Sequence, residues 1–161
     1  MLRDILLAVR GQLVGTGTND NASAGNVGEY IQSTVASGSA VTLTTATGNN
    51  VTSISLTAGD WDLDGQVDFS PAATTSVTQL NSSISLTSAT LSPQAGGSGL
   101  GPDGTTTINQ PAEVPTALIC LPTFTTRLSI AATTTVFLVA QANFTVAAMT
   151  AYGTIRARRI R

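Results

Sequence analysis

Between Trp61 and Phe69 the sequence alternates strictly between core-type and polar residues. Trp61, Leu63, Gly65, Val67 and Phe69 lie two residues apart, and acidic residues fill most of the positions between them. Side chains two residues apart point to the same face of a strand, whereas the repeat of a helix is about 3.6 residues. The pattern therefore predicts a half-buried strand whose acidic residues face outward.

Similar short segments rich in β-branched residues fill most of the chain after Tyr30. The longest run, Val136–Val146, is long enough for a helix, but its β-branched and aromatic residues favour a strand. Breaks rich in glycine, asparagine or proline separate the segments. The expected strands cover residues 40–44, 51–57, 61–69, 76–80, 83–86, 116–121, 124–131, 134–146 and 151–160. Many short strands without alternating helices predict an all-β fold, an antiparallel β-sandwich of the jelly-roll type.

Two of the breaks have a character of their own. The segment 94–104 is dense in glycine, so we expect a loop that offers an exposed contact. Pro111 and Pro115 are expected to bracket a second turn. The single cysteine, Cys120, lies in an apolar run and is expected to be a small buried residue.

The balance of charged residues limits the possible functions. The chain has 161 residues, which suits one main domain, and only 10% of them are charged. The net charge of −2 gives no general attraction to nucleic acid. Histidine is absent, so the usual general base is missing and we expect no enzyme and no cofactor. A carboxylate pair of the glycosidase kind is the alternative that remains.

The N-terminal segment differs from the rest. Residues 1–14 carry an apolar stripe at helical spacing, which predicts a short helix for docking or for trimer contacts. Residues 15–29 read as an irregular strap, and residues 30–161 as the β-sandwich domain. No segment predicts membrane insertion, and residues 1–10 do not resemble a signal peptide. The predicted contact residues are Leu2, Ile5, Leu6, Val9 and Leu13.

The segment Asp60–Gly65 has the opening pattern of an EF-hand calcium loop, with aspartates at alternate positions and a glycine. The twelfth position of such a loop would be Pro71 instead of glutamate, and the flanking segments read as strands. We therefore expect no metal site, with Asp60, Asp62 and Asp64 as the only candidates for one. The favoured interpretation is an acidic outer face that also includes Asp68.

Arginines are concentrated at the C-terminus, where Arg156, Arg158, Arg159 and Arg161 lie close together. A nucleic-acid patch would need aromatic platforms or a basic chain, and neither is present. We expect these arginines to form salt bridges with acidic residues, and the outer face around Asp60–Asp68 is the candidate partner.

Three segments, 18–30, 52–62 and 151–159, together resemble the distal β-domain of tailed-bacteriophage tail-fibre and virion appendage proteins. The resemblance implies a homotrimeric, non-enzymatic virion component, assembled in the host cytoplasm. Its partners would be its own copies and other virion proteins, such as a tail adaptor or the major capsid protein. A host cell-surface glycan is a further candidate partner.

Several functions remain open at this point. The preferred one is a trimeric tail-fibre-type appendage that contributes to attachment. The main alternative is a capsid decoration protein that stabilises the head shell. A small glycan depolymerase and a Ca²⁺-dependent glycan-binding module are the remaining candidates.

Overall fold

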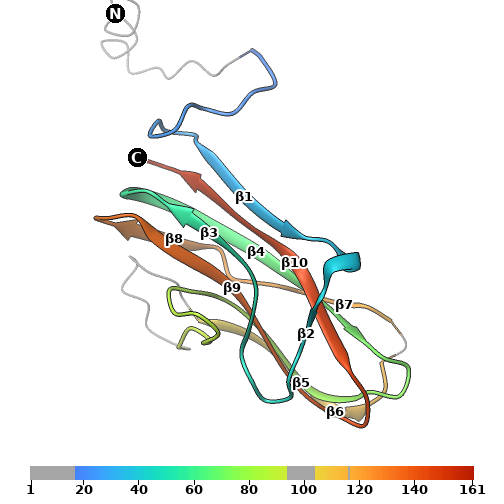
Figure 1. Ribbon diagram of the computed structural model, residues 1–161. Coiled ribbons are helices and arrows are strands. Elements are labelled where there is room, and N and C mark those ends of the chain that lie inside the picture. The colour runs from blue at the N-terminus through green and yellow to red at the C-terminus, as the bar shows by residue number, and fades with distance from the viewer. Residues whose placement is uncertain (1–16, 94–103, 116) are drawn as a thin grey trace, which may run out of the picture.

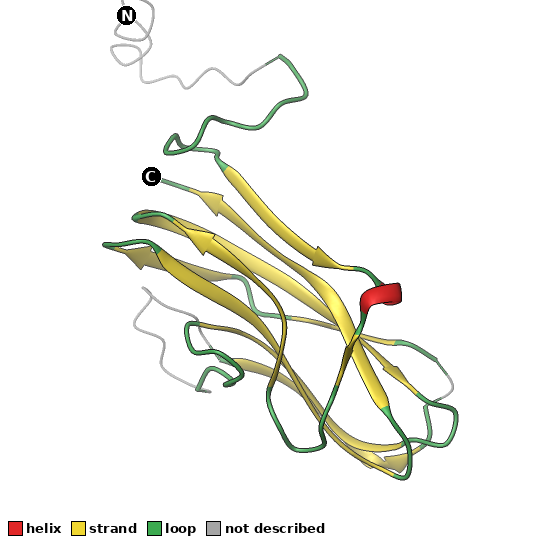
Figure 2. Ribbon diagram, in the orientation of Figure 1, coloured by secondary structure: helices red, strands yellow, loops and turns green. Residues whose placement is uncertain are grey.

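The computed structural model describes residues 17–93, 104–115 and 117–161. In this part of the chain nearly all regular structure is antiparallel strand, with one turn of 3-10 helix (Figure 2). The elements are β1 (Tyr30–Val35), η1 (Ser37–Ser39), β2 (Val41–Thr42), β3 (Asn49–Leu56), β4 (Gly59–Pro71), β5 (Ser76–Ser85), β6 (Thr105–Glu113), β7 (Ile119–Pro122), β8 (Thr126–Ile130), β9 (Thr134–Thr145) and β10 (Met149–Arg159). The all-β prediction is confirmed.

The strands form two sheets that lie one over the other (Figure 1). The first sheet is built on the long central pair β4 and β10, which run antiparallel. β1 and β2 follow one another along the outer edge of β10, and β8 and β7 do the same along β4. The second sheet has the order β3-β9-β5-β6.

One hydrophobic core joins the two sheets. The first sheet contributes the alternating residues of β4 and β10, among them Trp61, Phe69 and Ile155, which are fully buried. The second sheet contributes alternate residues of β9 and β5, such as Leu138 and Leu80. The apolar residues whose alternation predicted a half-buried strand at 61–69 therefore lie on the core-facing side of β4.

Several predicted boundaries were close and others were wrong. The run from Val136 forms β9, so the preference for a strand over a helix is confirmed. Residues 76–80 and 83–86 were predicted as two strands, but most of both belong to the single strand β5. Its register shifts between Val77 and Gln79, but pairing with both β6 and β9 continues from Gln79 through Ser83, across the predicted break.

The prediction of a turn beginning at Pro111 was wrong. Pro111 lies inside β6, a strand that the sequence did not suggest. β6 is the edge of the second sheet, where proline is tolerated because one side of the strand has no neighbour to receive an N–H.

Two further predictions fall outside the described residues. The N-terminal helix with Leu2, Ile5, Leu6, Val9 and Leu13 is one, and almost all of the loop 94–104 is the other. The strap is described from residue 17 and runs to the start of β1, beside the C-terminus (Figure 1).

Candidate functional site

Charge is unevenly distributed over the two sheets. All but one of the charged residues that the structure describes lie on the first sheet, on the strap or at the C-terminus. The exception is Glu113 at the end of β6. The others are Asp20, Glu29, Asp60, Asp62, Asp64, Asp68, Arg127, Arg156, Arg158, Arg159 and Arg161. The first sheet is therefore where a charged functional surface has to be sought.

Arg159 is the most deeply buried of these charges. Its side chain is only 5% exposed and points inward, where its guanidinium lies over the ring of Trp61 at 4.2 Å from the centroid. Its Nε donates to the Glu29 carboxylate at 2.8 Å, and its terminal nitrogens donate to Ala58 O and Thr57 Oγ1. The guanidinium thus has an anion, neutral acceptors and an aromatic face around it, which is what a buried arginine requires.

Glu29 connects this arginine to the strap. Its carboxylate also accepts the backbone N–H of Gly25 at 2.8 Å. The backbone of β10 adds two further bonds, from Gly28 N to Arg159 O and from Arg159 N to Glu29 O. Glu29 therefore fastens the strap to the last strand.

Asn21 makes a second attachment of the strap. Its side-chain amide donates to Tyr30 O at 2.7 Å, and its Oδ1 accepts Tyr30 N at 2.9 Å. This pair of bonds copies the exchange between two residues of an antiparallel ladder. The strap therefore has a fixed path at both attachments, although most of its residues are exposed.

Asp60 was predicted on a solvated or salt-bridged acidic outer face, and the structure shows it salt-bridged but buried. The residue is only 3% exposed, because the side chains of Arg127 and Arg161 cover it. Arg127 donates from Nε and Nη2, and Arg161 lies 2.6 Å away through Nε. The backbone of Asp60 also pairs with Ile160 and Arg161, so the C-terminus is held on this side as well.

Gly59 makes the close approach of Arg159 possible. Its φ is +147°, a conformation that favours glycine. A Cβ at this position would lie 2.0 Å from Nη1 of Arg159. The turn before β4 therefore has no room for a side chain where the arginine passes.

The outward residues of β4 and β10 form two facing rows. In the antiparallel register, Asp64 lies opposite Arg156 and Asp62 opposite Arg158. Arg156 is ion-paired with Asp64, with Nε donating at 2.7 Å. In the described residues no cluster of Cys, Asp or Glu side chains has the arrangement of a metal site. Asp60 and Asp64, two of the three candidate ligands, are occupied by arginines instead.

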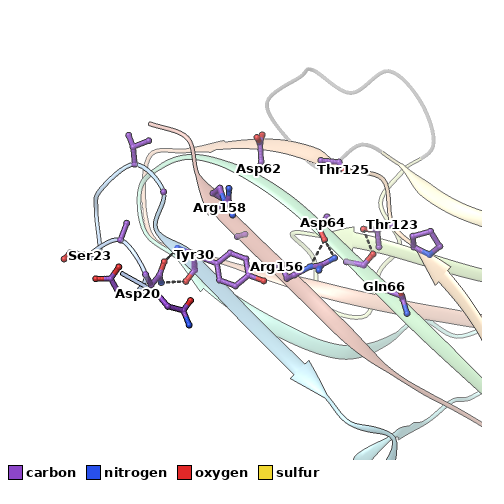
Figure 3. A pocket seen from close by; sticks show the side chains of 18 residues that line it. Asp20, Ser23, Tyr30, Asp62, Asp64, Gln66, Thr123, Thr125, Arg156 and Arg158 are labelled. Carbon is purple, nitrogen blue, oxygen red and sulfur yellow. Dashed lines mark hydrogen bonds and ion pairs between the residues drawn. The ribbon is translucent and has the colours of Figure 1, made fainter. Parts of the chain in front are cut away.

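A broad groove of about 1580 Å³ lies between the strap and this outer face. Figure 3 shows Asp20 and Ser23 of the strap on one side, with Asp64, Arg156 and Thr123 of the sheet region across from them. The lining mixes polar and apolar residues and carries both signs of charge. It comprises Asn19, Asp20, Asn21, Ala22, Ser23, Val27, Gly28, Tyr30, Asp62, Asp64, Gly65, Gln66, Pro122, Thr123, Thr125, Arg156, Ala157 and Arg158.

Cys120 lies on the same outer face, and the prediction that it is buried was wrong. In β7 the neighbouring Leu121 points into the core, so Cys120 points outward and is exposed. It lies opposite Asp68 of β4, and hydrogen bonding to that carboxylate raises the pKa of the thiol. An apolar sequence context did not reveal which of two adjacent residues faces the core.

The sequence did not predict one residue of the ion-pair system, Arg127, or one pairing, that of Glu29 with Arg159. Arg127 was not singled out, although it alternates with Leu128, a core residue, in a strand that the sequence did predict. The pairing of Glu29 with Arg159 joins residues 130 positions apart. Only the register of β1 against β10 brings them together, so no local signal could have found that pair.

Acid should weaken this ion-pair system. The N–H of Gly25, together with Arg159, holds the pKa of Glu29 below its ordinary value, and Arg127 does the same for Asp60. A carboxyl whose pKa is lowered by folding stabilises the protein above its unfolded pKa, and this stabilisation is lost as the pH falls through the folded pKa.

We therefore expect the free energy of unfolding, measured in urea at a series of pH values, to decline below about pH 4. Glu29→Gln should make that decline shallower, because one of the responsible carboxyls is gone. An equally steep decline in the variant would contradict this assignment.

The comparisons with known proteins add no relative: no family model, no curated protein and no solved structure matches this chain. Among the described residues, no helix has the length and apolar character needed to cross a membrane. The function must therefore be argued from the fold and from the site.

Proposed function

We propose that this protein is a bacteriophage virion structural protein, a homotrimeric tail-fibre-type appendage that contributes to attachment. The proposal unites the sequence resemblance in segments 18–30, 52–62 and 151–159 with the observed strand order. These segments form the strap and the first residue of β1, most of β3 with the start of β4, and most of β10. They contain the strap, the residues that surround Arg159 (Glu29, Thr57, Ala58 and Trp61), and Asp62, Arg156 and Arg158 of the two outward rows.

The strand order is the observation that carries the proposal. The strand pairs are nested around the connection between β5 and β6. Moving outward from that connection, β5 pairs with β6, β4 with β7 and β8, β3 with β9, and finally β1 and β2 with β10. We infer a jelly roll, because a long antiparallel hairpin wound into two sheets has this nested order. Jelly rolls recur in viral structural proteins and in lectins, so the fold supports a structural or binding role more than a catalytic one.

The mechanism would be multivalent attachment. Three copies present the same loops, and weak individual contacts then add through effective concentration. The fastening of the strap by Glu29, Arg159 and Asn21 supports this mechanism, because it gives a firm connection between the N-terminal segment and the sheets.

The capsid-decoration alternative receives less support from the arginines. A protein that staples a shell through its C-terminal arginines needs them available to the shell. Arg156, Arg159 and Arg161 each pair with a carboxylate of their own chain. Their partners favour a role in holding the fold together.

Location on the particle tests the proposal. Antibody against the full chain, with gold labelling of intact virions in electron micrographs, should mark the tail region. Labelling spread over the head would favour the decoration protein, and absence from purified particles would remove the virion proposal altogether. Light scattering of the purified chain at micromolar concentration should give three times its 16.3 kDa mass.

A further inference from the structure

We infer that the outer face of the first sheet, together with the groove under the strap, is the surface on which a second copy of this chain docks. The inference rests on the homotrimer of the proposed function and names the surface that holds it together. The size of the groove, its charges and the contrast with the other outer face favour a second copy as the occupant.

The dimensions favour a polypeptide over a small ligand. Pockets for small molecules usually enclose about 300–1,000 Å³, whereas this groove offers about 1580 Å³. One wall is the strap, whose residues are mostly exposed although Asn21 and Glu29 hold it to the start of β1 and to β10. Val27 on that wall is 56% exposed, an apolar side chain that a docked copy can cover.

The charges make the face complementary to itself. Asp62 and Asp64 form an acidic row on β4, and Arg156 and Arg158 form a basic row beside it on β10. Around a threefold axis, the acidic row of each copy can meet the basic row of the next, so that three copies close a ring. Asp62 and Arg158 are exposed in the single chain, so their charges can act on a neighbour, whereas Arg156 and Asp64 are already paired with each other.

The outer face of the second sheet lacks this property. Its polar side chains bond to one another across β9, β5 and β6: Asn81 bonds to Gln79, Gln141 and Thr107, and Gln79 to Asn109 and Asn143. Apart from Glu113, the described part of this sheet carries no charge. A neutral network already bonded within one copy offers a second copy little charge complementarity, so the first sheet is the better docking surface.

Charge reversal tests the surface on the full chain. Arg158→Glu and Asp62→Arg are expected singly to raise the dissociation constant of the assembly about tenfold or more, because like charges then face each other across the contact. The double variant, Asp62→Arg with Arg158→Glu, should recover most of the wild-type affinity because both rows change sign together. Glu113→Arg, on the other sheet, is the matched control and should leave assembly unchanged.

Sedimentation and cysteine labelling measure the effect of these substitutions on assembly. Sedimentation over a concentration series gives the dissociation constant, and a circular dichroism spectrum shows that each variant is folded. Maleimide labelling of Cys120, the chain's single cysteine, reports on the same face. Labelling should be slow in the wild-type assembly and faster in the single reversals.

The outcomes distinguish a failure of the docking surface from a failure of the homotrimer itself. A wild-type trimer whose affinity and Cys120 labelling are unchanged by the single reversals would overturn this docking surface and leave the trimer standing. A wild-type chain that is monomeric at micromolar concentration would overturn both. Loss of affinity in the single variants with recovery in the double variant would support the surface.

Discussion

Gly153→Ala is expected to lower the free energy of unfolding by about 4 kcal/mol, the sum of backbone strain and of a steric clash in a packed sheet. Gly153 lies in β10 between Val35 and Val67 of the neighbouring strands, with φ of +156°. A Cβ there would lie 2.1 Å from the carbonyl oxygen of Gln66 and 3.2 Å from Cα of Val67. These atoms belong to the backbone of β4, so relief requires the central strand pair to move apart.

Urea unfolding followed by circular dichroism measures this effect. Gly38→Ala is the matched control, because Gly38 lies in η1 with open space where the Cβ would be. The control should change the free energy of unfolding by no more than about 0.5 kcal/mol. Equal stability of the two variants would show that the strands do not approach as closely as described at Gly153.

Glu29→Ala is expected to lower the free energy of unfolding by about 3 kcal/mol, the usual cost of leaving one member of a buried ion pair without its partner. Arg159 would keep its position over Trp61 and its bonds to Thr57 and Ala58, but it would lose its anion. The strap would also lose the bond between the carboxylate and Gly25 N. Proteolysis within the strap should therefore accelerate in this variant.

Two further variants separate the ion pair from a general effect of removing charge. Asp64→Ala breaks the exposed pair with Arg156 and should cost only about 0–1 kcal/mol. Combining Glu29→Ala with Arg159→Met should recover part of the stability, because an apolar side chain needs no anion over the indole ring. A Glu29→Ala cost as small as that of Asp64→Ala would contradict the buried role of this pair.

Much of the fold was visible in local patterns. Alternation at Trp61–Phe69 identified the core-facing side of β4, and β-branched content identified β9 as a strand despite its length. Local patterns did not predict β6, because its position at the edge of the second sheet depends on the tertiary structure. Pro111 was read as part of a turn, because only the location of β6 at the edge of a sheet makes proline acceptable in a strand.

The candidate site was predicted in composition but only partly in arrangement. The sequence suggested that C-terminal arginines meet the acidic residues of 60–68, and Arg156 with Asp64 and Arg161 with Asp60 do so. It did not separate Arg159 from its neighbours. Alternation in β10 turns Arg156 and Arg158 outward and Arg159 inward, and the inward position is occupied by Trp61 and Glu29 instead of an aspartate.

The sequence alone determined the fold class, because period-two alternation and turn residues act over a few positions and need no knowledge of the partner strand. Tertiary structure alone decided which charges are buried and which remain on the surface. That outcome depends on the register of β10 between β1 and β4, which brings Glu29 to Arg159 and sets Asp62 opposite Arg158. Pairing between strands far apart in the chain is set by the packing of the whole core, so no short segment contains it.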